Sequence, residues 1–234
     1  MAAPSAQARP SNKTIALAFG AAIGAAVMLV VVALSLRNDG SVSPATPTPV
    51  VDLSGIQQSG AVLGSPDAKV TFVEYADPQC PGCRAYTETM FPTLVDEYVR
   101  TGKVATEFRG YPFIGPDSLK AYRFLLAAGE QNKLWNLAEA LYRNQGREND
   151  GWVTDDLVRR VAGQIPGLDV DRLFSDAQRA DIVKSASGAA AEASASGIRG
   201  TPTFLVKIGD QAPYFVQFGS IDELRATLDD ALTG

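Results

Sequence analysis

The sequence predicts an α/β domain over residues 61–234, with a block of helices inserted between two parts of one sheet and a membrane-spanning helix ahead of it. Three observations support this fold class. A strand pattern at 70–76 leads into a helix, and late strand patterns occur only at 203–218. Residues 111–196 carry almost no strand pattern and several amphipathic helical patterns. Residues 15–36 contain no charge and are long enough to cross a bilayer.

The uncharged run Ile15–Leu36 predicts an uncleaved transmembrane anchor. The apolar part of a cleavable signal peptide usually spans about 7–15 residues and precedes a small-residue cleavage site, and this run fits neither feature. Residues 1–14 hold two basic residues and no acid. The positive-inside rule therefore predicts a cytoplasmic tail at 1–14 and an extracytoplasmic domain on a single-pass protein of the cell membrane. Residues 37–60 are rich in Pro, Ser and Thr, which predicts an extended extracytoplasmic linker.

Composition narrows the chemistry that the domain can perform. The chain has a net charge of −5, which argues against nucleic acid as a partner. It contains two cysteines and no histidine, whereas a structural zinc site needs about four ligands. We see no phosphate-binding glycine loop, and we expect no metal and no cofactor.

The segment Val70–Ala76 is the predicted centre of the sheet, because apolar residues occupy both of its faces. A short turn follows, and then Cys80, Pro81, Gly82 and Cys83 open a helical pattern. Proline suits the first position of a helix, where a missing N–H costs nothing. This places Cys80 at the N-terminus of a helix and Cys83 one turn inside it.

A helix N-terminus stabilises a thiolate, which is the reactive form of cysteine. We therefore predict that Cys80 is a nucleophile and that Cys83 resolves the mixed disulfide it forms. The alternative is a purely structural disulfide. Closing so short a loop would contribute only about 2 kcal/mol in the chain-entropy model, near the low end for disulfides. We interpret the pair as redox-active.

The remaining elements follow in order. Residues 61–64 predict a short edge strand, Pro92 interrupts the helix after the cysteines, and 104–109 predict a strand that returns parallel to the first. Five helical patterns then lie at 116–130, 132–144, 154–164, 169–179 and 181–196. The chain closes with strands at 203–208 and 214–218, and with a helix that begins at the capping box of Ser220 and Glu223.

With these elements in place, the chain resembles the thioredoxin superfamily, and within it the DsbA-like thiol oxidoreductases. The resemblance rests on the CPGC motif, on Glu74 six residues before Cys80, and on Thr201 and Pro202 ahead of a late strand. It implies a thioredoxin-like fold with a helical insertion at about 111–196. The Pro81-Gly82 dipeptide departs from DsbA proper, which has a histidine between its cysteines. The oxidising strength therefore stays open.

The resemblance also implies roles beyond the cysteines. Glu74 would be a buried acid with a raised pKa that exchanges a proton with Cys83, rather than an ordinary acid at a solvated strand edge. The peptide bond before Pro202 would be cis, and the backbone of Thr201 would pair with the substrate peptide. The alternative is a proline that merely starts an edge strand. Independently of the resemblance, the apolar and aromatic residues Tyr111, Pro112, Phe113, Ile114, Trp135 and Trp152 would either line an apolar substrate groove or belong to the core.

These features predict an extracytoplasmic enzyme that introduces disulfides into exported client proteins with cysteines. An oxidase of this kind needs re-oxidation by a membrane redox partner, a DsbB-like or VKOR-like protein by resemblance. Two alternatives remain. The same scaffold also serves disulfide reductases and isomerases, which a reduction potential would distinguish. A peptide-binding chaperone with incidental cysteines would keep its activity when both cysteines are replaced by serine.

Overall fold

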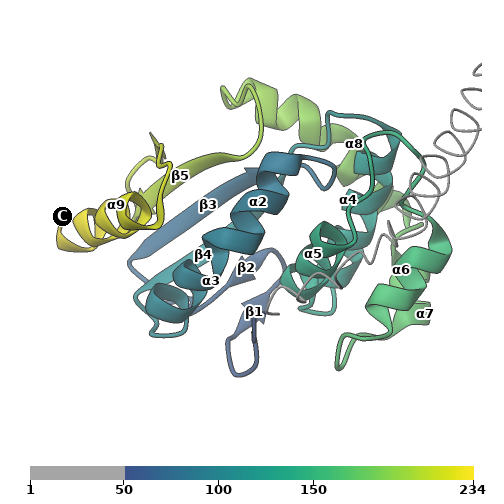
Figure 1. Ribbon diagram of the computed structural model, residues 1–234, viewed down its shortest axis with the longest axis horizontal. Coiled ribbons are helices and arrows are strands. Elements are labelled where there is room, and N and C mark those ends of the chain that lie inside the picture. Colours follow the sequence, from purple (N-terminus) through teal and green to yellow (C-terminus); the bar gives the residue numbers. More distant parts are fainter. Residues whose placement is uncertain (1–50) are drawn as a thin grey trace, which may run out of the picture. The chain divides into compact units, whose positions relative to one another are not determined.

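The computed structural model describes residues 51–234, which form a single six-stranded sheet with helices around it (Figure 1). The strand order is β1-β2-β4-β3-β5-β6. Strand β3 pairs parallel with β4 and antiparallel with β5, which makes it a central strand as predicted. The bounds are β1 Gln58–Ser59, β2 Val62–Leu63, β3 Val70–Ala76, β4 Val104–Gly110, β5 Thr203–Ile208 and β6 Tyr214–Val216.

The helical crossover between β3 and β4 begins with the cysteine helix. Helix α2 spans Pro81–Thr89, α3 spans Phe91–Leu94 and the π-helical turn η1 spans Val95–Val99. The break at Met90 lies just before Pro92, which sits in the first turn of α3, so the predicted interruption is confirmed. The last helix, α9 (Ile221–Thr233), packs beside η1, where the Tyr98 hydroxyl donates to an Asp229 carboxylate oxygen at 2.9 Å.

The helical insertion lies between β4 and β5, as predicted. It gathers at one side of the sheet, next to the first turn of α2 (Figure 1). Helix α4 contacts α5, α7 and α8 within it. The helices are α4 Pro116–Gly129, α5 Leu134–Arg143, α6 Asp155–Ala162, α7 Val170–Asp176 and α8 Ala180–Ala195.

An aromatic cluster fills the space between α2, α9 and the sheet. The ring of Phe204 on β5 stacks on Phe72 of β3 with centroids 5.3 Å apart. It lies 4.7 Å from both Tyr86 of α2 and Phe218. Such aromatic contacts add to the burial of apolar area that stabilises the core. The cluster fixes α2, and with it the cysteines, on the central strands.

The structure corrects the predicted boundary between the linker and the domain. Residues 51–60 belong to the folded unit rather than to an extended linker. Val51 and Leu53 are buried in the core, and the Val51 N–H donates to the buried carboxylate of Glu139 at 2.8 Å. The physical reason is that these apolar residues follow the last proline of the linker and can bury themselves against α5. The last predicted strand also ends earlier, at Val216.

The predicted cytoplasmic tail, the anchor at 15–36 and the linker up to residue 50 lie outside the described residues. Within residues 51–234, no helix combines the length and the apolar character needed to cross a bilayer. Membrane anchoring and the orientation of the chain stay predictions.

Candidate active site

The cysteine motif occupies the position that the sequence predicts. Strand β3 ends at Ala76, and Cys80 is the N-cap of α2 with an extended backbone (φ −70°, ψ 119°). Pro81 follows in the first turn. The Cys83 N–H donates to Cys80 Sγ at 3.3 Å, so the first free N–H groups of the helix point at the sulfur. Both cysteines are free thiols in this structure.

The groups around Cys80 favour its charged thiolate form. The hydrogen bond with the Cys83 side chain is the largest cause that lowers the pKa of Cys80, and the Thr201 side chain and the N–H groups of Cys83 and Gly82 lower it further. Burial acts in the opposite direction. The net effect lowers the pKa of Cys80 to about 6. This thiol is therefore ionised at neutral pH, which makes it a nucleophile and a good leaving group.

Cys83 has the opposite character. Its side chain is fully buried, and burial is the main cause that raises its pKa well above the ordinary value. The hydrogen bond with Cys80 and the nearby charges of Glu74 and Cys80 act in the same direction. Cys83 therefore holds its proton while Cys80 releases one, an asymmetry that suits a resolving thiol.

Glu74 is buried on β3, between Phe108 of β4 and Phe204 of β5 in the strand register. Burial, together with the charge of Cys80, raises the pKa of Glu74 to about 8. One of its carboxylate oxygens has no hydrogen-bond partner among the described residues. The expectation of a buried acid with a raised pKa is confirmed, and the solvated strand edge is wrong. Its role in proton transfer stays a prediction.

The loop before β5 faces the cysteine motif. The Thr201–Pro202 peptide bond is cis, as the resemblance implied. The Cys80 thiol donates to the Thr201 carbonyl oxygen at 3.2 Å. A Cβ atom at Gly82 would lie only 3.1 Å from Pro202 Cδ, which explains why this position suits glycine. Strand β5 pairs on both sides, so Pro202 does not start an edge strand.

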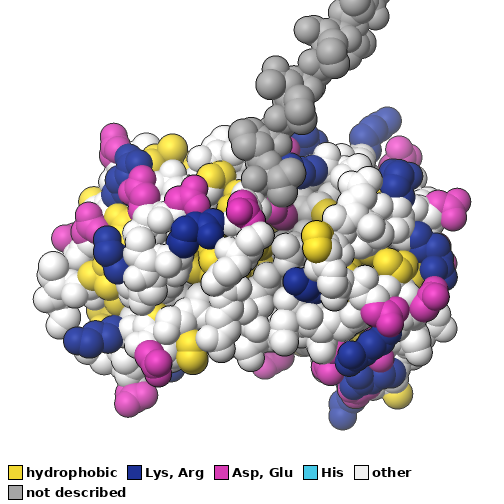
Figure 2. Space-filling model, turned by 90° about the horizontal axis from the view of Figure 1, so that it is seen from below, with side chains coloured by type: hydrophobic (Ala, Val, Ile, Leu, Met, Phe, Trp, Pro, Cys, Tyr) yellow, Lys and Arg dark blue, Asp and Glu magenta, His cyan; other side chains and the backbone are white. Residues whose placement is uncertain are grey.

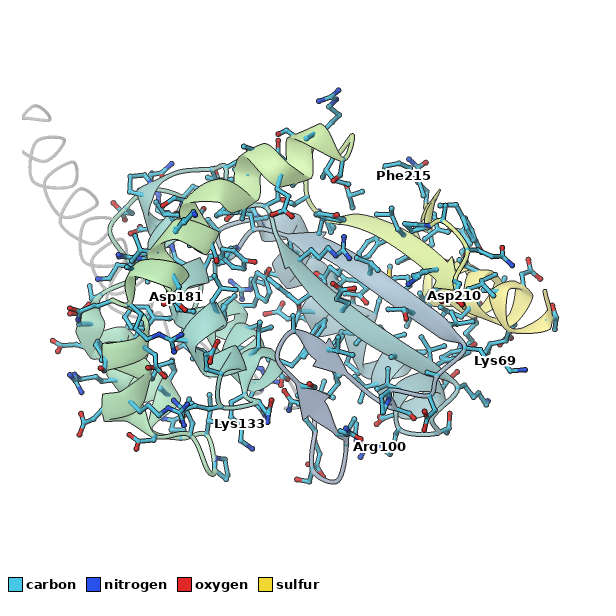
Figure 3. The ribbon with its side chains drawn as sticks, turned by 180° about the vertical axis from the view of Figure 1, so that it is seen from behind. Lys69, Arg100, Lys133, Asp181, Asp210 and Phe215 are labelled. Carbon is cyan, nitrogen blue, oxygen red and sulfur yellow. The ribbon has the colours of Figure 1, made fainter. Side chains whose placement is uncertain are left out.

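A cavity of about 520 Å³ opens beside this loop. Pro202, Phe204, Phe215 and Phe218 line it together with polar residues of the β6–α9 connection. Phe215 is 56% exposed, and Figure 3 shows it at the edge of the sheet near β5 and β6. Sequence reasoning did not single out this residue, because an aromatic in a short strand pattern gives no sign that it stays uncovered.

The aromatic residues considered for a groove divide between core and surface. Trp135 is buried and stacks on Phe91 with centroids 5.1 Å apart, so it belongs to the core. Phe113 is 47% exposed and stacks on Tyr111 at 4.5 Å. Its backbone N–H donates to the Asp77 carboxylate in the turn before Cys80, which places it next to the active site.

Sequence reasoning also missed the polar residues of that turn. Asp77 and Gln79 are fully buried, and both are hydrogen-bonded to the helical insertion. The only sequence signal was their position between a strand and the cysteine motif. Polar residues at such a position usually indicate an exposed turn.

Comparison with known proteins agrees with this geometry. A thioredoxin family profile matches residues 57–230. The chain is 31% identical over 234 residues to the probable disulfide bond formation protein D of Bacillus cereus, covering 95% of this chain and 98% of that protein.

Two solved structures show the same fold. BdbD from Bacillus subtilis in its oxidised form superimposes with a TM-score of 0.64 at 24% identity, covering 76% of this chain and 97% of that one. Wolbachia pipientis α-DsbA1 does so with a TM-score of 0.64 at 21% identity, covering 79% and 93%. Its fold is that of the DsbA-like proteins, and the chain belongs to the thioredoxin family and is a thiol–disulfide oxidoreductase.

Proposed function

We propose that this enzyme introduces disulfides into exported client proteins through the Cys80–Cys83 pair. The observation that carries the proposal is the contrast between the two thiols: the pKa of Cys80 is lowered to about 6, whereas that of the buried Cys83 is raised. A stabilised Cys80 thiolate favours the reduced form of the pair, and a pair with a stabilised reduced form is a stronger oxidant.

The first half of the reaction forms a mixed disulfide. A client thiolate attacks Cys80 Sγ of the oxidised pair, the Cys80–Cys83 bond breaks, and a bond between the client sulfur and Cys80 forms. Cys83 leaves as a thiolate and takes a proton from Glu74. The raised pKa of Glu74, about 8, keeps that carboxyl protonated at neutral pH and ready to give the proton.

The second half releases the product. A second client thiolate attacks the client sulfur of the mixed disulfide and expels Cys80 as a thiolate, the better leaving group of the pair. The client has lost two electrons, and the enzyme has gained them as a dithiol. The Thr201–Pro202 loop next to Cys80 would pair with the client backbone and hold its sulfur in line for attack.

The enzyme must then return its electrons. We infer that residues 15–36 anchor it in the cell membrane with the catalytic domain extracytoplasmic, where disulfides persist. A DsbB-like or VKOR-like membrane protein would re-oxidise Cys80 and Cys83. A reductase or isomerase on the same scaffold is the alternative, and it would take electrons from a membrane donor.

Trapping the mixed disulfide tests the attack at Cys80. In a Cys83→Ser variant the second thiol of the pair is absent. A client whose single cysteine is held as a mixed disulfide with thionitrobenzoate should therefore be attacked by the Cys80 thiolate, which expels thionitrobenzoate and leaves a stable client–Cys80 disulfide. The matched Cys80→Ser variant should form none. Capture by the Cys80→Ser variant instead would overturn the assignment of the nucleophile.

A further inference from the structure

Gln79, the residue directly before Cys80, is fully buried although its side chain is polar. Its side-chain amide donates to Ser118 Oγ of α4 at 2.9 Å. The same amide nitrogen donates to Asn149 Oδ1 at 3.1 Å, and its carbonyl oxygen accepts from the Asn149 N–H at 2.7 Å. Every partner of this side chain therefore comes from the helical insertion. A buried amide so fully bonded holds its backbone in one place.

The backbone conformation of Asn149 places its hydrogen-bonding groups opposite the Gln79 side chain. The residue lies in the loop between α5 and α6 with a positive φ of 58°, which presents its N–H and its side chain to Gln79 together. Its own amide donates to the carbonyl oxygen of Ile114 at 3.1 Å. Gly115 leaves room for it, because a Cβ atom there would lie 1.9 Å from Asn149 Oδ1.

Asp77 fixes the other end of the same turn. One carboxylate oxygen of Asp77 accepts from the Gln79 backbone N–H at 2.8 Å and from the Ser118 hydroxyl at 2.5 Å. The other accepts from the N–H groups of Phe113 at 2.9 Å and Ile114 at 3.0 Å. The Asp77 carbonyl oxygen accepts from the Cys80 N–H at 2.9 Å. Hydrogen bonds therefore restrain the backbone from Asp77 to Cys80.

We propose that Gln79 is a positioning residue for the thiol–disulfide reaction, which with Asn149 and Ser118 holds the turn 77–80 so that Cys80 Sγ faces the Cys83 N–H. The inference rests on the proposed role of Cys80 as the nucleophile. The helical insertion then contributes directly to the reactivity of the cysteine pair. Without the Gln79 amide the turn would relax, and the 3.3 Å contact between Cys80 Sγ and the Cys83 N–H would lengthen.

The test replaces Gln79 by leucine in the full-length chain. We expect the thiolate fraction of Cys80, followed by its ultraviolet absorbance against pH, to fall about threefold at pH 6. The equilibrium with glutathione should shift about threefold towards the disulfide form, or about 14 mV lower in reduction potential.

Gln131→Leu is the matched control. Gln131 also forms two amide hydrogen bonds with one residue, with its Nε2 donating to the Asp169 carbonyl oxygen at 3.1 Å and the Asp169 N–H donating to its Oε1 at 2.9 Å. It does so within the helical insertion and without contacting the turn. We expect it to alter urea stability only. If Gln79→Leu likewise alters stability but leaves the Cys80 titration and the glutathione equilibrium unchanged, Gln79 is merely structural and the inference is wrong.

A second variant covers the case in which Gln79→Leu fails to fold. Asn149→Gly tolerates the positive φ and keeps the backbone N–H, so it removes only one of the two bonds to Gln79. We expect a smaller shift in the same direction, and an unchanged Cys80 titration would contradict the inference. These shifts are measured relative to the unsubstituted chain, so they remain readable even if its potential proves to be that of a reductase.

Discussion

At the scale of single residues, the reaction depends on two thiols that hold their protons very differently. Cys80 caps α2 and ionises readily, whereas Cys83 is buried one turn further along. The carboxyl of Glu74 lies on the strand beneath them and is itself protonated at neutral pH. Of these three adjacent groups, one is therefore ionised and two hold their protons at neutral pH, which is an arrangement that suits stepwise thiol exchange.

The rate of thiol attack should follow the ionisation of Cys80. Alkylation of the reduced chain by iodoacetamide should be half-maximal near pH 6 and should slow below it, because the thiolate is lost as the pH falls through the pKa of about 6. Thr201→Val removes a hydroxyl that lowers this pKa, so its midpoint should move upward. Thr203→Val, whose hydroxyl donates to the Gly200 carbonyl oxygen, is the control and should leave the midpoint in place.

Glu74→Gln should slow formation of the mixed disulfide and leave the fold intact, because the amide cannot give a proton to the departing Cys83 thiolate. Stopped-flow exchange with a reduced peptide would measure the rate, and far-ultraviolet circular dichroism would check the fold. Glu148→Gln is the control, since Glu148 lies exposed on the surface. Equal rates for Glu74→Gln and the unsubstituted enzyme would remove Glu74 from the mechanism.

The same substitution should change the dependence of stability on pH. The folded chain holds the Glu74 proton up to about pH 8, whereas the unfolded chain releases it near pH 4.3. The folded state binds more protons within that window, so this group lowers the free energy of unfolding as the pH rises. Glu74→Gln should be increasingly more stable than the unsubstituted chain between pH 5 and pH 8 in urea titrations. A constant difference would show that Glu74 is not buried as a neutral acid.

At the scale of elements, the helical insertion and the N-terminal segment both brace the sheet. The segment from Val51 lies against α5, where its first N–H meets Glu139. Val51 and Leu53 are buried at 7% and 5% exposure. Strand β1 then pairs with β2 at the edge of the sheet. This segment is therefore part of the domain that carries the cysteines.

Truncation should reveal the contribution of this segment. A chain that begins at residue 61 loses two buried apolar side chains, each stabilising by about 1.5–3 kcal/mol, so its free energy of unfolding should fall by about 2–4 kcal/mol after partial compensation. A chain that begins at residue 51 is the matched control. Urea unfolding measures the stability of both chains, and equal midpoints would show that residues 51–60 belong to the linker rather than to the domain.

At the scale of the whole molecule, the face of the domain seen in Figure 2 carries acidic and basic side chains side by side rather than one dominant sign. The net charge is −5. Neither the mixture of surface charges nor this net charge would select client proteins strongly by their charge. Recognition of clients would then rest on the backbone of the Thr201–Pro202 loop and on the cavity next to it, which has both apolar and polar lining residues. This suits an enzyme that meets many unfolded sequences.

Much of this organisation was readable from the sequence, for physical reasons. In the strand at Val70–Ala76 and in the helices of the insertion, the apolar residues recur with a clear period. The cysteine motif marks the start of the helix that follows it. Strand β1 was not predicted, because its two residues, Gln58 and Ser59, are polar and carry no strand pattern. The bonds of Gln79 to Ser118 and Asn149 join residues 39 and 70 positions apart, and such contacts leave no local pattern.

The reduction potential of the Cys80–Cys83 pair, equilibrated against glutathione, tests the proposed function most directly. The low pKa of Cys80 stabilises the reduced form, so we predict an oxidising value near about −120 mV, as for a disulfide donor. A value near about −270 mV, like that of thioredoxin, would contradict it and make this enzyme a reductase supplied with electrons from across the membrane.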